Sequence, residues 1–530
     1  MASYPKNRFA TMTAAVALAS GILAPSAGIA GEVTLKSTDG TININGEFVD
    51  YQDDTFIVRT ALGELRVAAS SVVCEGESCP TFDAVAADVA IVGSDAIGLG
   101  MMPLLMTGFA ASVDADAELT NAAGGQTLAT LIGDGGFGDE IGAYLVSSTN
   151  DENAFESLLD GSAKIAMSSR RITRDEARAL RADGASSMVN PDQEHIIAVD
   201  SMVVVTHADN PVDELTKEQL QKIFAGDIRN WSELGGPDKP INVIMHEEDS
   251  ASHEYFMTYL YGDQRPNFLP QGIAPDDQTL SNVLFSDKNA IGYLGYAFQR
   301  GAKPVTLINE CGIAVRPDAF SAKTEEYTLA RRMYLYNRDD NLDQGAEAFL
   351  DFVRSTDSDS LIGKSGFIDL GIARRAQDEA DPRRIMLTEA AARYDAGFEG
   401  AEMRGMLEAM GEFDRLSTTF RFATGSSRLD ERGRLDMARL IDYLADAPAG
   451  TKAKFVGFTD DVGAFDANKV LAQERAAAVM AEFQAVAGGR LNGIELIAEG
   501  FGEIAPSACN VSDRGREINR RVEVWISNDA

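Results

Sequence analysis

The sequence predicts a multidomain α/β protein that begins with a small all-β module. Three observations support this prediction. The chain has 530 residues, too many for one hydrophobic core and enough for about three or four domains of ~100–200 residues each. Residues 31–84 alternate polar and apolar positions in short runs, as β-strands do. Residues 85–375 and 413–530 instead alternate strand-like with helix-like segments.

Composition indicates a globular protein with an acidic surface. Hydrophobic residues make up 45% of the chain and charged residues 24%, which provides enough apolar side chain for packed cores and excludes a disordered chain. Asp and Glu number 82 against 47 Lys and Arg, so the formal net charge is −35. This excess of negative charge disfavours nucleic acid and anionic membrane surfaces as general partners.

Residues 1–30 have the features of a signal peptide. Lys6 and Arg8 supply the positive start, and an apolar stretch, "TMTAAVALASGILA", follows. The small residues of "AGIA" then provide a cleavage site near Ala30. The apolar stretch is short for a bilayer span, and no cysteine follows it for lipid attachment. We therefore expect a periplasmic protein, with an uncleaved amphipathic anchor as the alternative.

The four cysteines pose two different questions. Cys74 and Cys79 in "CEGESCP" have the spacing of a small closed loop, and export to an oxidising compartment permits that disulfide. A zinc site there would need more ligands, and all four histidines lie far away in sequence, so we expect neither a metal nor a cofactor. Cys311 and Cys509 lie in different predicted domains, and the sequence leaves open whether they are paired or are buried thiols.

Helix and strand signals define the middle block, residues 85–375. Within it "HIIAVDSMVVVTH" predicts strands and "TKEQLQKIFAG" predicts a helix. Thr216 with Gln219, and Thr173 with Glu176, have the spacing of N-terminal capping boxes. The class of this block is therefore α/β.

Two further segments complete the chain. Residues 376–412 are charged, helix-compatible and interrupted by Pro382, which predicts a helical linker. Residues 413–530 alternate helices and strands again and predict a compact α/β sandwich. In the first helix of this block, one buried face is formed by Met437, Leu440, Ile441 and Leu444.

One strand end in the last block has a pattern suited to ligand binding. Asp460 and Asp461 close the strand "TKAKFVGF", at the edge of an α/β sheet where ligands gather. Asn468 and Arg475, seven residues apart, lie on one face of the following helix. A carboxylate and a guanidinium in this arrangement suit a zwitterion, since Asp takes an ammonium group and Arg takes a carboxylate. The alternative is a partly exposed salt bridge between loop and helix.

The last block resembles the OmpA-like peptidoglycan-binding family in "FATGSSRLD", "GFTDDVGAFDANKVLAQERAAAV", "GFGEIAP" and "GREINRRVEVW". The resemblance implies that Asp460 and Arg475 hold the diaminopimelate of the cell-wall stem peptide. It gives accessory positions to Thr459, to Asn468 and to the arginine of "NRRVE", which is Arg520 or Arg521. The family usually has His or Tyr where this chain has Phe458, so a polar group is replaced by an apolar one.

The middle block is similar to the PstS-type phosphate receptors of bacterial ABC importers. The similarity is carried by "LTKEQLQKIFAGDIRNWSELGG", "NAIGYLGYAF" and "KIAMSSRRIT". It implies a two-lobed periplasmic binding protein fold, residues 85–375, that closes on a desolvated oxyanion. Backbone N–H groups at helix N-termini and Ser or Thr hydroxyls would hold that anion, so few positive charges are needed.

The residues that the second resemblance assigns to an anion depart from the family pattern. The candidates are Thr127, Leu128, Ser148, Thr149, Ser169, His246, Ser250, Ala251 and Ser252. The family has Arg at the position of His246. The family also has an Asp that accepts the proton of phosphate, and this chain has a different residue at that position, near Ser169. Asp151 and Glu152 add negative charge where an anion would approach. For the Ser and Thr residues, helix capping is the alternative role.

These patterns together predict a binding protein and not an enzyme. None of the motifs "GxSxG", "HExxH" or a phosphate-cradling lysine loop is present. We expect a periplasmic solute-binding protein that is tethered to peptidoglycan, near the wall or outer membrane. It would bind phosphate or a related oxyanion for uptake with an ABC permease. The alternative is an envelope interaction protein whose receptor-like domain no longer binds a solute.

Overall fold

The structure is a computed structural model of the chain. It describes residues 32–37, 43–52, 55–60, 63–68, 72–76, 78–79, 87–122, 126–248, 250–393, 398–421 and 431–528. The predicted signal peptide lies outside the described residues. The chain divides into two compact units, Met1–Asp83 and Ala84–Ala530, and each is considered by itself.

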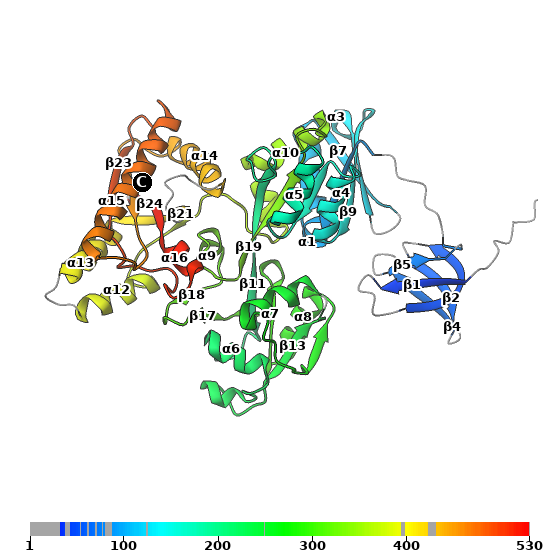
Figure 1. The fold of residues 1–530 in the computed structure, drawn as a ribbon, viewed down its shortest axis with the longest axis horizontal. Coiled ribbons are helices and arrows are strands. Elements are labelled where there is room, and N and C mark those ends of the chain that lie inside the picture. The colour runs from blue at the N-terminus through cyan, green and yellow to red at the C-terminus, as the bar shows by residue number, and fades with distance from the viewer. Residues whose placement is uncertain are drawn as a thin grey trace, which may run out of the picture. The chain divides into compact units, whose positions relative to one another are not determined.

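The first unit contains a five-stranded antiparallel sheet, which confirms the predicted β module (Figure 1). Its strands are β1 (Glu32–Ser37), β2 (Asn43–Gln52), β3 (Thr55–Thr60), β4 (Gly63–Ala68) and β5 (Val72–Glu75), in the spatial order β4-β3-β2-β1-β5. Alternate residues of β1 and β3 form its small core, among them Leu35 and Val58, because side chains alternate between the two faces of a strand. A disulfide joins Cys74 to Cys79, with 5.8 Å between their Cα atoms.

The second unit begins with a central domain of two lobes. Lobe A contains β6 (Val89–Ser94), α1 (Asp95–Gly100), α2 (Met102–Ser112), β7 (Ala115–Ala122), β8 (Gln126–Ile132), α3 (Gly133–Gly136), β9 (Glu140–Thr149), α4 (Asp151–Leu159), β10 (Ile165–Ser168), α5 (Arg174–Ala182), α10 (Gln344–Arg354), η4 (Thr356–Ser358) and α11 (Asp359–Lys364). Lobe B contains β12 (Glu214–Thr216), α6 (Lys217–Phe224), η2 (Trp231–Leu234), β13 (Asn242–His246), α7 (Ala251–Tyr261), β14 (Gly272–Ala274), α8 (Asp277–Ser286), β15 (Ala290–Gly295), η3 (Tyr296–Phe298), β16 (Lys303–Pro304), β17 (Thr306–Ile308) and β18 (Ala314–Val315).

Two long strands, β11 (Glu194–Thr206) and β19 (Ala330–Asn337), connect the lobes (Figure 1). The main sheet runs through both lobes in the order β14-β13-β15-β11-β19-β10-β6-β9-β8-β7. Every residue of β11 is buried; its first part pairs with β19 and its last part with β15 of lobe B. The continuous apolar run in this part of the sequence is therefore a strand covered on both faces. Each lobe has its own hydrophobic core.

The predicted capping boxes are present and confirm two helix starts. The Thr173 hydroxyl accepts a hydrogen bond from the backbone N–H of Glu176, whose carboxylate accepts one from the backbone N–H of Thr173. Thr216 and Gln219 make the same reciprocal pair at the start of α6. Each box satisfies backbone N–H groups that have no partner within the helix.

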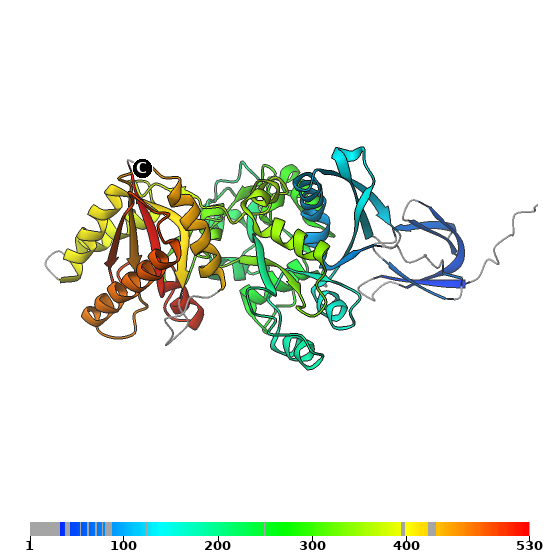
Figure 2. The same ribbon diagram turned by 90° about the horizontal axis from the view of Figure 1, so that it is seen from above.

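The C-terminal domain is a mixed sheet with helices on both faces (Figure 2). Its elements are β20 (Arg374–Arg375), α12 (Pro382–Arg393), α13 (Phe398–Glu412), β21 (Phe413–Arg421), α14 (Glu431–Ala445), β22 (Lys452–Gly457), α15 (Phe465–Ala487), β23 (Glu495–Gly500), α16 (Asp513–Asn519) and β24 (Arg521–Ser527), and the strand order is β20-β21-β24-β22-β23. The predicted face of α14 packs with α15 and one side of the sheet; it comprises Met437, Leu440, Ile441 and Leu444.

The predicted linker 376–412 needs a correction. Helices α12 and α13 form a core with the second face of the sheet, in which Leu387 and Met406 pack with Phe501 and Trp525. Trp525 faces this core while its neighbours Val524 and Ile526 face the α14–α15 core, as strand alternation requires. The segment is therefore a layer of the C-terminal domain. The prediction was based on the charged residues of the segment and overlooked its apolar stripe of Met, Leu and Ala.

The C-terminal domain is attached to both lobes of the central domain. Arg439 of α14 donates to Asp359 of lobe A at 2.5 Å, and Leu435 packs on a lobe A core. Cys509 forms a disulfide with Cys311, which lies between β17 and β18 of lobe B. This pairing answers the question that the sequence left open.

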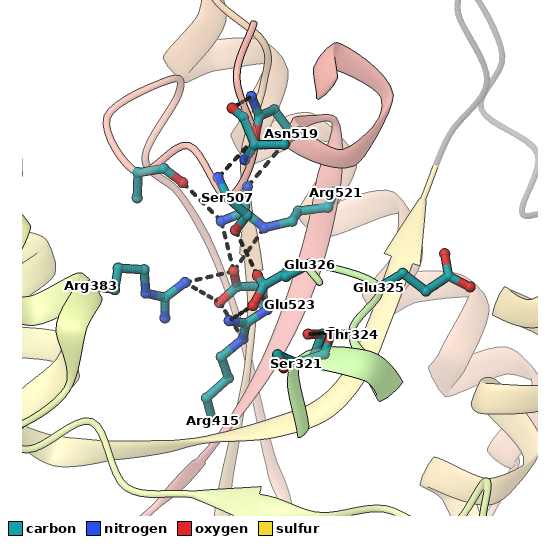
Figure 3. Close-up of polar contacts among 12 residues, drawn as sticks. Ser321, Thr324, Glu325, Glu326, Arg383, Arg415, Ser507, Asn519, Arg521 and Glu523 are labelled. Atoms are coloured by element: carbon teal, nitrogen blue, oxygen red, sulfur yellow. Dashed lines mark hydrogen bonds and ion pairs between the residues drawn. The ribbon is translucent and has the colours of Figure 1, made fainter. Parts of the chain in front are cut away.

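A buried network of charges also joins the two domains (Figure 3). Glu523 of β24 is fully buried and accepts hydrogen bonds from Arg383 at 2.7 and 3.0 Å and from Arg521 at 2.8 Å. Arg415 bridges the domains because its Nε lies 3.0 Å from Glu523 Oε2 while its two Nη atoms donate to Glu326 at 3.1 and 2.8 Å. Glu326 follows α9 (Ala319–Lys323) of the central domain.

Candidate functional site

In the C-terminal domain, three charged side chains meet at the predicted strand edge. Asp460 follows β22, Arg475 lies on α15, and Arg520 immediately precedes β24. Arg520 Nη1 donates to Asp460 Oδ2 at 2.8 Å, and both side chains are mostly buried. Burial lowers the pKa of Arg475; the positive charge of Arg520 lowers it further, and Asp460 opposes both effects. Arg520 is therefore hydrogen-bonded to Asp460, and Arg475 lies near enough to interact electrostatically with the same carboxylate.

The accessory residues Asn468 and Thr459 hold the loop that carries Asp460. Asn468 Nδ2 donates to the backbone oxygen of Asp460 at 3.3 Å and to the carboxylate of Glu503. The backbone N–H of Thr459 donates to the oxygen of Gly502 at 2.9 Å, and its side chain is buried. In this structure both residues position the site because their hydrogen bonds hold the backbone around Asp460 in place.

Of the two arginines in "NRRVE", Arg520 lies at the site and Arg521 does not. Arg521 is fully buried, donates to Glu523 and to the oxygen of Ala505, and has its guanidinium carbon 4.2 Å from the centre of the Phe458 ring. Arg521 is therefore a core residue, which corrects its assignment as a ligand-binding position. Phe458, the departure from the family pattern, is the aromatic surface on which Arg521 rests.

A cavity of about 260 Å³ adjoins this edge. Asp461 lines it together with Pro506, Asn510 and Val511 of the C-terminal domain. Cys311 and Ile313 of lobe B complete the wall. The central domain therefore borders the space beside Asp461.

In lobe A, three adjacent parallel strands end beside the starts of helices. The register pairs Gly93 with Ser148, and Ser94 with Thr149, while β10 lies on the other side of β6. Ser148, Thr149 and Ser169 therefore come together at the carboxyl edge of the sheet. Ser94, which the sequence analysis missed, belongs to the same edge; its signal was a small polar residue between a strand and a helix.

The donors at Ser169 are occupied by a carboxylate of the chain itself. Asp151, the first residue of α4, accepts hydrogen bonds from the backbone N–H and the hydroxyl of Ser169, both at 2.8 Å. Arg170 Nε lies 3.9 Å from the same carboxylate. Burial raises the pKa of nearby Asp95, and the charge of Asp151 adds to that shift. The Asp151 carboxylate therefore accepts hydrogen bonds from the groups of Ser169 that were expected to donate to a bound anion.

Thr127 and Leu128 lie elsewhere in lobe A. Both are within β8, where Thr127 pairs with Val146 and Leu128 with Leu145 of β9. The structure therefore places them inside a strand and not at the start of a helix. Their predicted contact with an anion has no support from this position.

In lobe B, the remaining candidates surround the start of α7. Ser250 caps the helix by accepting from the backbone N–H of His253 at 3.1 Å, which is the alternative role named for such residues. Ala251 and Ser252 form its first turn. His246 is buried, with Nε2 2.9 Å from Asp277 Oδ1 and 3.2 Å from the oxygen of Tyr293. His246 is thus held by an acidic side chain of α8.

Arg331 on the connecting strand β19 is a basic residue that the sequence analysis missed. Its Nε and Nη2 donate to Asp200 at 3.0 and 2.8 Å. Burial opposes its charge, but Asp200 and the more distant Asp277 raise the pKa of Arg331. Arg331 also acts electrostatically on Asp95 of lobe A. No short motif marked this residue, because its acidic partners come from distant segments.

Comparison with known proteins identifies the two parts of the second unit. A model of the PBP superfamily domain matches residues 110–357, and a model of the OmpA family matches residues 421–520. The chain contains a PBP-like domain and an OmpA domain. Both resemblances expected from the sequence are confirmed, and so is the fold class.

Relatives and similar structures cover the two domains separately. The phosphate-binding protein PstS of Bacillus subtilis is 30% identical over 188 residues, which is 34% of this chain and 60% of that protein, so the chain spans less than two thirds of this relative. PstS of Pseudomonas aeruginosa is 29% identical over 246 residues, 42% of this chain and 73% of that protein. An ABC-type phosphate transport receptor from Vibrio cholerae has a TM-score of 0.39 at 21% identity, covering 53% of this chain and 99% of the receptor. The periplasmic domain of Helicobacter pylori MotB has a TM-score of 0.19 at 25% identity, covering 22% of this chain and 76% of that domain.

Two features are absent from the described residues of the PBP-like and OmpA domains. Neither domain brings together three or more His, Cys, Asp or Glu side chains in a metal-binding cluster within the described ranges. No described helix has the length and apolar character needed to cross a membrane.

Proposed function

We propose that this protein is a periplasmic solute-binding protein that its OmpA domain holds on peptidoglycan. Its PBP-like domain binds phosphate or a related oxyanion and delivers it to an ABC permease. The observation that carries the proposal is the group of Asp460, Arg475 and Arg520 at the strand edge of the OmpA domain. The names of the PstS relatives support the choice of phosphate.

The charged group suits the zwitterionic end of diaminopimelate. Asp460 accepts hydrogen bonds from the ammonium, and the guanidinium groups of Arg475 and Arg520 bind the carboxylate in a two-pronged arrangement. Arg520 already holds Asp460 in place before a ligand arrives. Pre-organisation of this kind reduces the entropic cost of binding.

We expect Asp460→Ala and Arg475→Ala each to weaken binding to purified sacculi by more than tenfold. Truncating one partner of a buried, hydrogen-bonded charge pair costs about 2–5 kcal/mol of binding free energy. The measurement is co-sedimentation of the full chain with sacculi over a range of sacculus concentrations. The exposed residues Asp446 and Arg490 provide matched controls as Asp446→Ala and Arg490→Ala. Wild-type sedimentation of both site variants would remove the peptidoglycan assignment.

Phosphate binding in the PBP-like domain requires a rearrangement at the lobe A edge. Ser94, Ser148 and Thr149 offer hydroxyl groups there, and α4 offers backbone N–H groups at its start. Asp151 engages Ser169, so an incoming oxyanion must displace that carboxylate. Removing Asp151 should therefore make the donors available and remove a like charge.

The contact between Asp151 and Ser169 also favours a second candidate function. If the internal carboxylate is a permanent substitute for the anion, the PBP-like domain serves as an interaction surface in the envelope and binds no solute. The pairing of His246 with Asp277 at lobe B supports the same alternative, because that position also has an internal partner.

We expect Asp151→Ala to bind phosphate about tenfold more tightly than the wild type, since juxtaposed like charges cost several kcal/mol. The measurement is titration calorimetry of the full chain with phosphate in a buffer free of other oxyanions. Glu152→Ala is the matched control, because Glu152 is the exposed neighbour of Asp151 on α4. Absence of heat and of a thermal shift at millimolar phosphate in both wild type and Asp151→Ala would contradict phosphate binding and favour the second candidate function.

A further inference from the structure

We propose that a cavity between the PBP-like domain and the OmpA domain binds a small multivalent anion that carries phosphoryl oxygens. The cavity has a volume of about 440 Å³. Its wall contains five arginines, namely Arg171, Arg331, Arg332, Arg421 and Arg514. None of the residues predicted to bind an anion lines it, so this site goes beyond the proposed function.

The five arginines come from four distant parts of the chain. Arg331 and Arg332 lie on β19, and Arg171 follows β10 of lobe A. Arg421 ends β21 and Arg514 lies on α16, both in the OmpA domain. The site exists only when the two domains are packed together. The disulfide between Cys311 and Cys509 maintains that packing.

Positive charge in the wall exceeds negative charge. Glu325 and Glu517 are the acidic residues of the lining. Behind the wall, Glu194 pairs with Arg171 and Asp200 pairs with Arg331. The five arginines then face four carboxylates, so the group keeps an excess of one positive charge, and Arg332 and Arg421 share the single carboxylate of Glu325. This excess contrasts with the net charge of −35 of the chain.

Arg421 shows that the positive charge is incompletely compensated. It is 7% exposed and donates to Glu325 Oε2 at 2.9 Å and to the backbone oxygen of Thr324. Its Nε lies buried with no hydrogen-bond partner among the described residues. Burial lowers the pKa of Arg421, Glu325 opposes that effect, and the charge of Arg514 lowers the pKa further. A buried cationic donor at a cavity wall needs an acceptor, which an anion would supply.

The chemistry and the size of the site indicate the class of ligand. Guanidinium groups bind phosphoryl oxygens through paired hydrogen bonds, and several of them together favour an anion with more than one charge. The volume is within the range of small-molecule sites, about 300–1,000 Å³. Tyr334 and Val199 add a less polar part to the wall. An inorganic pyrophosphate or an organic bisphosphate therefore suits the site better than a single orthophosphate.

The test is titration calorimetry of the full chain with inorganic pyrophosphate and, separately, with fructose 1,6-bisphosphate. We expect saturable binding of at least one of them, and about tenfold weaker binding in Arg514→Gln, because a hydrogen bond to a charged group is lost. Arg514 is suitable for substitution because its side chain is 62% exposed and its ion pair is with Glu517 of the same helix. Arg490→Gln is the matched control, because Arg490 is an arginine of similar exposure with one acidic partner. The probe that binds more tightly shows whether the ligand is an inorganic or an organic phosphate compound.

A second pair of variants tests the side of the cavity that the PBP-like domain provides. Arg171→Gln should weaken binding as Arg514→Gln does, whereas Arg178→Gln on the exposed face of α5 should not. Absence of heat with both probes, or equal affinities in Arg514→Gln and Arg490→Gln, would overturn the proposal. Neither result would affect phosphate binding at lobe A.

Discussion

Glu523→Gln is expected to lower the free energy of unfolding of the unit Ala84–Ala530 by about 3–5 kcal/mol, the usual cost of breaking a buried ion pair. Glu523 is fully buried and is shared by Arg383, Arg415 and Arg521. Its replacement by a neutral amide leaves three buried guanidinium groups with too little negative charge. The Trp525 indole N–H, which donates to Glu523 at 2.8 Å, would also compete with the arginines for the one oxygen that the amide retains.

The effect of Glu523→Gln should depend on pH. Burial tends to raise the pKa of Glu523, but Arg383, Arg415 and Arg521 together lower it to about 2. A carboxylate whose pKa is lower in the folded state stabilises the fold above its unfolded pKa, and that stabilisation is lost as pH falls. The difference between wild type and variant should therefore be full near pH 7 and should decrease between about pH 4.5 and pH 2.

Denaturant unfolding followed by tryptophan fluorescence measures this effect, since Trp525 is in direct contact with the substituted residue. The matched control is Glu495→Gln, which removes an exposed carboxylate paired with Lys452 on a neighbouring strand. Exposed pairs of this kind contribute about 0–1 kcal/mol. Equal stability of the two variants would show that the interdomain network does not stabilise the unit.

The double variant Cys311→Ser with Cys509→Ser is expected to destabilise the same unit by about 2–5 kcal/mol. The disulfide joins residues 198 positions apart, so reduction frees a long loop in the unfolded chain. In the chain-entropy model the cost of freeing a loop grows with the logarithm of its length. In limited proteolysis, the protease should also cut the variant more rapidly between the PBP-like and OmpA domains, because the disulfide between them is lost.

The second disulfide provides the control for this variant. Cys74→Ser with Cys79→Ser opens a loop of 5 residues in the other compact unit. The expected loss is about 2 kcal/mol and is confined to the transition of that unit. Scanning calorimetry of both double variants separates the two transitions. An unchanged transition of the unit Ala84–Ala530 in the Cys311→Ser, Cys509→Ser variant would contradict the predicted role of the interdomain disulfide.

Local patterns were sufficient for the elements and for part of the site. The capping boxes at Thr173 and Thr216 are contained within four residues, so their chemistry is visible in the sequence. The buried face of α14 follows from helical periodicity in the same way. The spacing of Asp460, Asn468 and Arg475 likewise predicted that these residues lie near one another, at the end of one strand and on the helix that follows it.

Other features depend on which distant segments meet, and the sequence alone could not identify them. Asp151 reaches Ser169 because α4 and the end of β10 lie side by side, 18 residues apart in sequence. Arg520 rather than Arg521 joins Asp460 because the register of β24 turns Arg521 into the core. Helices α12 and α13 became a layer of the C-terminal domain because the second face of its sheet was apolar.

The sequence by itself determined the fold class and the residue types at each strand edge, because these follow from periodicity. It also indicated the two domain families, because several of its motifs resemble those of known families. The tertiary structure alone decided the partners of those residues. Interdomain ion pairs, the disulfide between Cys311 and Cys509, and the arginine cavity all join positions far apart in the chain. Such contacts depend on packing in three dimensions, which has no local pattern in the sequence.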